Sequence, residues 1–314
     1  MTKASFFTPL LVAGLAIMGT ACNQSGKVLD TPTSGHIKIS VDETFAPIME
    51  AEANAFQGLY KYAKIQAEYK PETEVIRALL EDTVRLVIST RHLTDKEVAE
   101  LDKQKLVPRT TKIAVDGIAL ILNNENTDST LTLQQVRDIF TGKTTTWKQL
   151  DPTNKGGEIT IVFDSGNSST ARYILDSINQ KQPLPANTFS ANSNSKVLDY
   201  VAQNRNAIGI IGVNWISDRD DSTATSFLKN VKVAGISRNP NPTSEEEYVQ
   251  PYQAFLAQGT YPLRREVYMI SKEARAGLGT GFASFLVGDK GQRIILKSGL
   301  VPASMPVRIV SITE

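Results

Sequence analysis

The sequence predicts an α/β fold of two lobes, each a mixed sheet with flanking helices, with a ligand cleft between the lobes. Strand and helix patterns alternate from residue 35 onward, and a second such series begins near residue 117. The chain of 314 residues is long enough for two medium domains. In sheets of this kind, ligands bind in the crevice at the carboxyl ends of the strands.

The first series alternates strand and helix three times. Residues 36–41 alternate apolar and polar side chains, as a strand does, and apolar residues then recur at helical spacing up to Phe56. Thr94, with Glu97 three residues later, predicts a capped helix start. We expect strands at 36–41, 63–69 and 84–89, and helices at 45–56, 75–80 and 94–105. This order implies parallel strands that are covered on both faces.

The second series contains the longest apolar strand. Residues 112–115 and 117–123 form a nearly continuous apolar run, and residues 207–213 are typical of a buried strand. We expect further strands at 159–163, 231–236 and 261–271, and helices at 133–140, 168–179, 197–202, 281–288 and 290–298. We assign residues 35–116 and about 261–314 to lobe I, and about 117–260 to lobe II.

Residues 1–21 are typical of a secretory signal, because Lys3 precedes an apolar run that ends in small residues. The run is too short to span a membrane comfortably. Cys22, the single cysteine, follows directly, as in bacterial lipoproteins, although Gly19 replaces their usual leucine. An ordinary signal peptide is the alternative. We expect a lipidated Cys22, a flexible tether over residues 22–34, and a membrane-anchored protein that faces the periplasm or the cell exterior.

The composition disfavours several classes of function. The formal net charge is +1, without the basic excess of a nucleic-acid binder. The two histidines, His36 and His92, and the single cysteine offer no metal-ligand spacing. The nucleophile pattern Gly-x-Ser-x-Gly fails because residue 170 is Thr170. We therefore expect no enzymatic activity, no metal, no cofactor and no nucleic-acid partner, and we expect a monomer.

Three predicted helices begin with hydroxyl residues directly after a strand. These starts are Thr44-Phe45, Thr73 and Ser168-Ser169-Thr170. Free amides and the positive dipole end make a helix start an anion site. Ordinary capping explains any one of them, but three such starts can converge on one crevice. Arg91, which follows Ser89, and Arg172 have the planar fork that suits an oxyanion, although each fits a surface ion pair as well.

Five stretches carry a resemblance to a known family. They are LTLQQVRDIFTGKTTTWKQL at 131–150, SST at 168–170, AIGIIGVNW at 207–215, YPLRREVYM at 261–269 and FLVGDKGQRIILKSGLVP at 285–302. Over most of residues 36–303 the chain resembles the type II periplasmic-binding-protein family, in its phosphate-binding branch that serves bacterial ABC importers. The resemblance implies a two-lobe fold, hinged closure on the ligand and delivery to a membrane permease.

The resemblance also implies which residues contact phosphate. They are Thr44, Phe45, Thr73, Ser89, Arg91, Ser168, Ser169, Thr170 and Arg172. The chain departs from the family at several of these places. Ser169 replaces a glycine, Thr90 is inserted before Arg91, and Asp164 stands where the family has a ligand-binding arginine, a role that Arg172 can take from the next turn. Glu72 and Glu74 flank Thr73 where the family is rich in glycine.

A carboxylate would distinguish phosphate, which carries a proton near neutral pH, from sulfate, which carries none. Glu74 and Asp164 are the candidate proton acceptors, ahead of Glu72; a solvated carboxylate at a helix start is the alternative for each. We therefore expect an exported lipoprotein that captures phosphate ion for an ABC transporter permease. The alternatives are a sensor or surface scaffold with an altered site, or a binder of another oxyanion or an organic phosphate.

Overall fold

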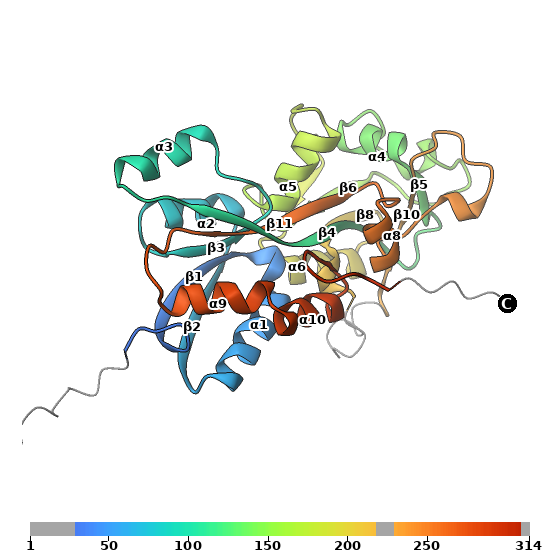
Figure 1. Ribbon diagram of the computed structural model, residues 1–314. Coiled ribbons are helices and arrows are strands. Elements are labelled where there is room, and N and C mark those ends of the chain that lie inside the picture. Colours follow the sequence, from blue (N-terminus) through green and yellow to red (C-terminus); the bar gives the residue numbers. More distant parts are fainter. Residues whose placement is uncertain (1–28, 218–228, 309–314) are drawn as a thin grey trace, which may run out of the picture.

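The computed structural model describes residues 29–217 and 229–308, which form one long mixed sheet flanked by helices (Figure 1). The strand order is β2-β1-β3-β11-β4-β8-β6-β7. These strands are β1 (Ser34–Asp42), β2 (Tyr62–Lys70), β3 (Leu86–Ser89), β4 (Arg109–Asn123), β6 (Thr160–Phe163), β7 (Thr188–Ser190), β8 (Ala207–Gly212) and β11 (Arg264–Ser271). Two short strands, β9 (Val231–Val233) and β12 (Val301–Pro302), also pair with β4. A separate pair is formed by β5 (Thr130–Thr132) and β10 (Gly235–Ser237).

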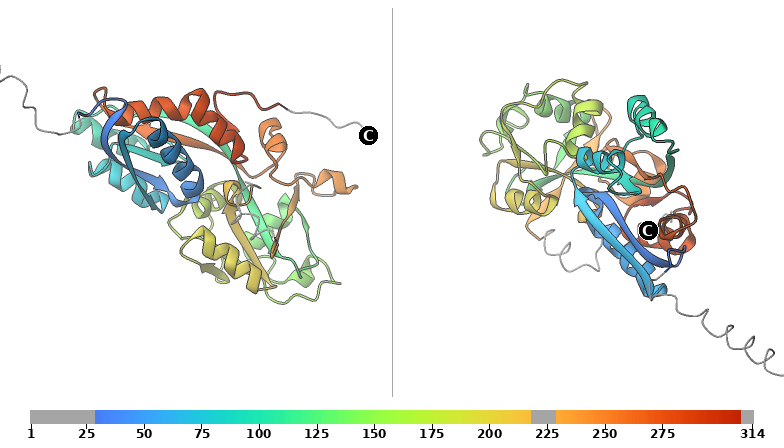
Figure 2. Two further views of the ribbon diagram at one scale, coloured as in Figure 1. Left: turned by 90° about the horizontal axis from the view of Figure 1, so that it is seen from below. Right: turned by 90° about the vertical axis from the view of Figure 1, so that its left-hand side faces the viewer.

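Two halves of this sheet meet along β4. We call the strands β2, β1, β3 and β11, with the start of β4, the first half, and the end of β4 with β8, β6 and β7 the second half. Seen from below, the two halves lie side by side (Figure 2). β1 runs parallel to β2 and β3, as the alternating series predicts, whereas β11 runs antiparallel between β3 and β4. Because β4 spans 15 residues, one continuous strand links the halves.

Helices cover both faces of the first half. α1 (Ala46–Leu59), α9 (Leu278–Val287) and α10 (Asp289–Lys297) pack together, and Ile88 of β3 belongs to their core. Its neighbour Val87 points to the opposite face and packs with α2 (Glu72–Leu80). This alternation is what a strand buried on both faces requires. α3 (Asp95–Lys103) begins with the predicted capping box of Thr94 and Glu97.

The second half carries four further helices among the described residues. They are α4 (Leu133–Phe140), α5 (Ser169–Tyr173), α6 (Asn194–Gln203) and α8 (Gln253–Gln258). The helix predicted over residues 168–179 is α5 followed by a π-helical turn, Ile174–Ile178. The strand predicted over 231–236 is divided between β9 and β10, which belong to different sheets. We did not predict α8, β5, β7 or β12, because each is too short to show a periodic pattern.

The described chain begins at Leu29, so the predicted signal and Cys22 lie outside the described residues. The end of the predicted tether is packed rather than free. Asp30 accepts hydrogen bonds from the amide of Leu278 (2.9 Å), the first residue of α9, and from Arg275 (3.0 Å), just before that helix. The chain at Pro32 packs closely against Gly281 of α9. A side chain at residue 281 would prevent this, because its Cβ atom would lie 1.7 Å from the Pro32 carbonyl oxygen. Within the described ranges, no helix is long and apolar enough to cross a membrane.

Candidate functional site

The three helix starts singled out in the sequence come together between the two halves. Thr44 lies in a 3-10 turn directly after β1, and its hydroxyl is 3.4 Å from that of Ser169, the first residue of α5. Thr73, in the first turn of α2, donates its hydroxyl to the carbonyl of Asn167 (3.2 Å), just before α5. Both contacts join the first half to the second. We use the name polar cluster for the polar side chains around these contacts, which are Asp42, Thr44, Glu72, Asp116, Asp164, Ser168, Ser169, Thr170, Arg172 and Arg265.

Hydrogen bonds hold both the amide and the carbonyl of Thr44 in place. Its amide donates to Asp42 Oδ1 (3.1 Å), and its carbonyl accepts from Asn214 Nδ2 (3.0 Å) and from Trp215 Nε1 (2.8 Å). Gly212 at the end of β8 is necessary for this approach, because a Cβ atom there would lie 2.5 Å from Thr44 Cγ2. The second half therefore holds the Thr44 backbone, and leaves its hydroxyl directed at Ser169.

The Ser168–Thr170 turn is closed by its own hydrogen bonds. Ser168 caps α5 by accepting from the Ala171 amide (3.2 Å), and its hydroxyl lies 2.8 Å from that of Thr170. Thr170 donates to Asp164 Oδ1 (2.5 Å). All of these side chains are buried. Asp164, predicted to accept a phosphate proton, thus adjoins the turn and is held by one of its hydroxyls.

Arg265 is the cation at the centre of the polar cluster, and sequence reasoning missed it. It projects from β11, with its Nη1 2.8 Å from Ser169 Oγ and its Nε 3.0 Å from Asp116 Oδ2 on β4. Its guanidinium carbon also lies 5.3 Å from the centre of the Phe45 ring, so Phe45 lines the cluster through its ring. The one available signal was an arginine inside an otherwise apolar strand pattern, within the YPLRREVYM stretch.

Arg172 and Ser89 converge on Glu72 at the edge of the polar cluster. Arg172 donates from Nε to Glu72 Oε2 (2.5 Å) and from Nη2 to the Thr90 hydroxyl (2.7 Å). Ser89 donates to Glu72 Oε1 (2.9 Å), as does Thr90 (2.7 Å). Glu72 is thereby surrounded by donors, and Arg172 and Ser89 are both engaged with it.

Two predicted site residues are placed elsewhere. Arg91 turns toward α3 and forms a two-pronged ion pair with Glu97, at 2.7 and 2.8 Å. Glu97 is fixed by the capping box at the start of α3, and it draws the guanidinium away from Ser169 and Thr44. Glu74 is exposed and lines a surface hollow with Lys38, Lys70 and Arg77, so it does not join the cluster.

Burial sets the charge of the cluster carboxyls. Burial, reinforced by nearby Glu72, raises the pKa of Asp42 to about 7. Burial also raises the pKa of Asp164, against the hydrogen bonds from Ser168 and Thr170. For Glu72, burial opposes ionisation, but the Arg172 charge and hydrogen bonds from Arg172 and Thr90 hold the pKa below its usual value. The cluster therefore contains one carboxylate that is firmly ionised, Glu72, and two carboxyls whose pKa values are raised by burial, Asp42 and Asp164.

A family model described as a PBP superfamily domain matches residues 28–290. The chain belongs to the PBP superfamily.

Curated relatives in this superfamily share a common name. A phosphate-binding protein PstS from Staphylococcus epidermidis is 24% identical over 287 residues, which cover 90% of this chain and 84% of that protein. A phosphate-binding protein PstS from Pseudomonas aeruginosa is 25% identical over 296 residues, covering 90% of this chain and 87% of that protein. The alignments extend across almost the whole of each relative.

Solved structures of this superfamily share the fold. A candidate phosphate ABC transporter substrate-binding protein with bound phosphate, from Clostridium perfringens, superposes with a TM-score of 0.71 at 24% identity, over 86% of this chain and all of that one. An ABC-type phosphate transport receptor from Vibrio cholerae gives a TM-score of 0.63 at 21% identity, over 85% of this chain and all of that one. The predicted two-lobe α/β fold of the type II binding proteins is confirmed.

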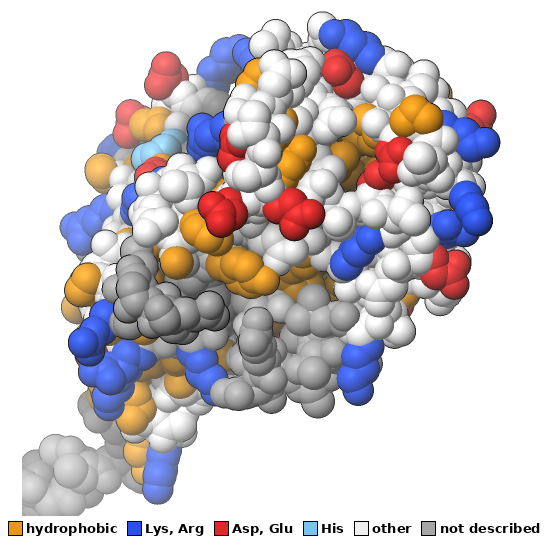
Figure 3. Space-filling model, turned by 90° about the vertical axis from the view of Figure 1, so that its right-hand side faces the viewer, with side chains coloured by type: hydrophobic (Ala, Val, Ile, Leu, Met, Phe, Trp, Pro, Cys, Tyr) orange, Lys and Arg blue, Asp and Glu red, His pale blue; other side chains and the backbone are white. Residues whose placement is uncertain are grey.

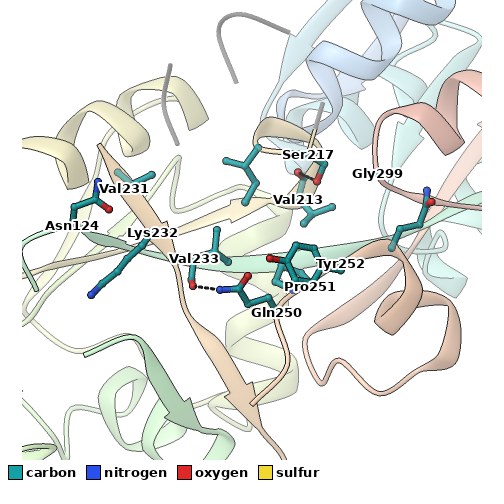
Figure 4. Close-up of a pocket in the computed structure, with 12 residues that line it drawn as sticks. Asn124, Val213, Ser217, Val231, Lys232, Val233, Gln250, Pro251, Tyr252 and Gly299 are labelled. Carbon is teal, nitrogen blue, oxygen red and sulfur yellow. Dashed lines mark hydrogen bonds between the residues drawn. The ribbon is translucent and has the colours of Figure 1, made fainter. Parts of the chain in front are cut away.

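A hollow of about 470 Å³ lies apart from the polar cluster. It opens where apolar side chains are exposed on the right-hand face of the molecule (Figure 3). Figure 4 shows its wall of β9 and the segment from Gln250 to Gln253, with Gln250 bonded to the Val233 carbonyl (2.8 Å). Lys232 is the one charged residue in the described lining, and it donates to the Asn126 carbonyl. Its described lining has hydroxyls from Ser217, which donates to the Val213 carbonyl (2.7 Å), and from Tyr252, but it has no guanidinium like that of Arg265.

Proposed function

We propose that this chain captures inorganic phosphate outside the cytoplasm and delivers it to an ABC importer. The observation that carries the proposal is that three donors from both halves lie together. The hydroxyl of Ser169 lies within hydrogen-bond distance of the Thr44 hydroxyl and of the Arg265 guanidinium. Such donors bind the oxygens of an oxyanion. The curated relatives named for phosphate binding support the choice of ligand. Ser168, Thr170, Phe45 and Thr73 line the same region.

In this proposal the ligand enters while the two halves are apart and is enclosed when they close. Because Thr44, Thr73 and Arg172 each contact the opposite half, separating the halves would break all three contacts and expose the donors to solvent. β4 pairs with β11 in the first half and with β8 in the second, so it crosses between the halves and serves as the hinge. In this proposal residues 35–116 and about 261–314 move as lobe I against about 117–260 as lobe II.

Export and anchoring complete the proposal. Residues 1–21 direct secretion, and acylated Cys22 retains the protein at a membrane surface beside its permease. Asp30 fixes the start of the folded part against α9, so a short stretch after Cys22 is left to act as the tether. The protein binds as a monomer and performs no chemistry on its ligand.

Calorimetric titration tests the ligand. Protein freed of bound anion by unfolding and refolding is titrated with phosphate, with sulfate as the control. We expect micromolar or tighter binding of phosphate and no heat from sulfate. Equal binding of both anions would point to a general oxyanion binder, and binding of neither would remove phosphate capture.

A second candidate function is a sensor or scaffold with an altered site. The position where the family has a ligand-binding arginine is Asp164, which is buried among Thr170 and Asn194. A carboxyl in this place weakens an anion site unless it is protonated. Tight phosphate binding would reject this candidate; absence of binding, with an intact thermal transition, would favour it.

A further inference from the structure

Exposed hydrophobic side chains lie together at the end of the molecule where the described chain begins. Among the described residues, seven large hydrophobic side chains are exposed, and four of them lie at this end: Leu29, Leu59, Tyr60 and Tyr62. Tyr62 is the most exposed of the four, at 74%. Single exposed hydrophobic residues are ordinary, whereas a group of them marks a contact surface. This end of the molecule lies at the lower left in Figure 1.

Sheet pairing brings together the two segments that carry these side chains. The start of β1 lies beside the start of β2, with Ser34 opposite Tyr62. Ser34 donates its hydroxyl to the carbonyl of Leu29 (2.7 Å), which holds the first described residue at the same end of the sheet. The Ala63 amide donates to the Tyr60 carbonyl (2.9 Å) and closes the turn between α1 and β2. Leu29 and the turn therefore share one surface at the amino ends of the strands.

Two lysines lie among these hydrophobic side chains. Lys61 and Lys64 are exposed, and they line one surface hollow together with Tyr62. No acidic residue occurs between residues 58 and 67, and Asp30 nearby is already engaged with the start of α9. This end of the sheet thus combines hydrophobic side chains with positive charge. We give the name amino-end surface to Leu29, Leu59, Tyr60, Lys61, Tyr62 and Lys64.

Lysines beside exposed tyrosines suit the boundary of a phospholipid bilayer. Tyrosine has an apolar ring and a polar hydroxyl, and it is enriched where a membrane meets water. Lysine can bury its stem and leave its ammonium group among anionic head groups. Leu29 follows Cys22 by seven residues, which span at most about 25 Å when fully extended. A lipid on Cys22 would therefore hold the amino-end surface within that distance of the bilayer.

We propose that the amino-end surface binds an anionic phospholipid bilayer, as a second membrane contact beside the lipid anchor. The inference rests on the proposed anchoring through Cys22. Lipid chains and a basic surface act together in attachment of this kind. The contact also sets the orientation of the protein. β1 runs nine residues from this surface to Asp42, roughly 25–30 Å, so the polar cluster at its other end is held away from the bilayer.

The test uses the exported chain, residues 22–314, coupled through its single cysteine to a maleimide lipid in vesicles of phosphatidylglycerol and phosphatidylcholine. Tyr62→Trp places a fluorescent reporter on the amino-end surface. Phe189→Trp is the matched control, because Phe189 is exposed on β7, at the opposite edge of the sheet. Lipid with brominated acyl chains quenches a tryptophan that enters the bilayer. We expect it to quench the Tyr62→Trp reporter and to leave the Phe189→Trp reporter unchanged.

Lys61→Gln/Lys64→Gln, combined with Tyr62→Trp, isolates the charge. Each lysine near an anionic surface contributes roughly fivefold to binding, so we expect the equilibrium constant for contact, taken from the quenched fraction, to fall at least about tenfold. Raising the salt concentration should weaken the contact in the same direction. Lys148→Gln/Lys155→Gln is the matched control, because it removes two exposed lysines from the second half. It should leave the quenching of the Tyr62→Trp reporter unchanged.

Three results would overturn the inference and leave phosphate capture standing. They are absence of quenching at the Tyr62→Trp reporter, equal quenching at both reporters, and unchanged quenching after loss of Lys61 and Lys64. Shielding of the Tyr62→Trp reporter from dissolved acrylamide, without quenching by brominated lipid, would mean that a second copy of the chain covers the surface, and would also overturn it. An unmodified Cys22 in the exported protein, found by mass spectrometry, would overturn the proposed anchoring and this inference with it.

Discussion

Arg172 on α5 reaches Glu72 on α2 with its Nε 2.5 Å from Oε2, so this ion pair connects the second half of the sheet to the first. Glu72 is 2% exposed, whereas the Arg172 side chain is 31% exposed. Ser89 and Thr90 also donate to Glu72, and all of these donors except Arg172 belong to its own half. Of these hydrogen bonds to Glu72, the ones from Arg172 are therefore those that opening of the halves would break.

We predict that Arg172→Gln lowers the free energy of unfolding by roughly 1–3 kcal/mol, because it leaves a buried carboxylate without its cation. Thermal unfolding should show this as a fall of a few degrees in Tm. The double variant Arg172→Gln/Glu72→Gln should lose less than the single one. Arg293→Gln, which removes an exposed ion pair with Asp289, is the control and should leave Tm unchanged. Equal losses in the single and double variants would contradict this account.

We predict that the buried ion pair Arg265–Asp116 and the half-buried ion pair Arg91–Glu97 differ sharply in their effect on phosphate binding. Arg265→Gln/Asp116→Asn removes the pair inside the polar cluster without leaving a lone charge, and should raise the Kd for phosphate at least about a hundredfold, since charge-assisted donors are the strong ones. Arg91→Gln/Glu97→Gln removes an equivalent pair outside the cluster and should leave the Kd within about twofold. Calorimetry on both decides; the reverse order would return Arg91 to the site.

Gly212→Ala should weaken phosphate binding by about tenfold. The added methyl group would meet Thr44 Cγ2 at 2.5 Å, and Thr44 cannot retreat while Asn214 and Trp215 hold its carbonyl. Overpacking of this kind costs about 1–3 kcal/mol, and 1.4 kcal/mol corresponds to tenfold in Kd. Gly166→Ala is the matched control, because nothing lies within 4 Å of its Cβ position. An unchanged Kd in Gly212→Ala would show that Thr44 is not a ligand contact.

Glu52 on α1 should make the stability of the protein depend on pH. It is fully buried, and within the described part of the chain neither carboxyl oxygen has a hydrogen-bond partner. Burial raises its pKa from 4.5 to about 9. The folded protein therefore holds a proton that the unfolded chain releases, so the stability is greatest below the unfolded value and falls as pH rises toward about 9.

We predict that Glu52→Met raises Tm, and that the gain is larger at pH 8 than at pH 5. Thermal unfolding at the two pH values measures it. Glu50→Gln, an exposed position on the same helix, should change Tm little at either pH. A gain of equal size at both pH values would mean that packing, and not the buried proton, accounts for the effect.

Much of this fold was predictable because its strands are long or uniformly apolar. β1, β2, β3, β4 and β8 lie within a residue or a few of their predicted positions, and the capping box of Thr94 and Glu97 is present. The site was harder, since its contacts join distant residues. Arg265 and Asp116 are 149 residues apart, and no local pattern links them. For Arg91 the sequence allows either an anion contact or a surface ion pair, and the structure pairs it with Glu97, six residues later at the start of α3.

The position of β11 has a consequence for the order in which the chain is made. It lies between β3 and β4, yet its residues 264–271 follow those of β4 by about 150 positions in the chain. During synthesis or passage across a membrane, β3 and β4 emerge without the strand that joins them, and Asp116 emerges without Arg265. Such distant pairing is slow to form. A nascent chain shorter than about 270 residues therefore lacks most of β11, and β4 is the strand that links the two halves until translation is nearly complete.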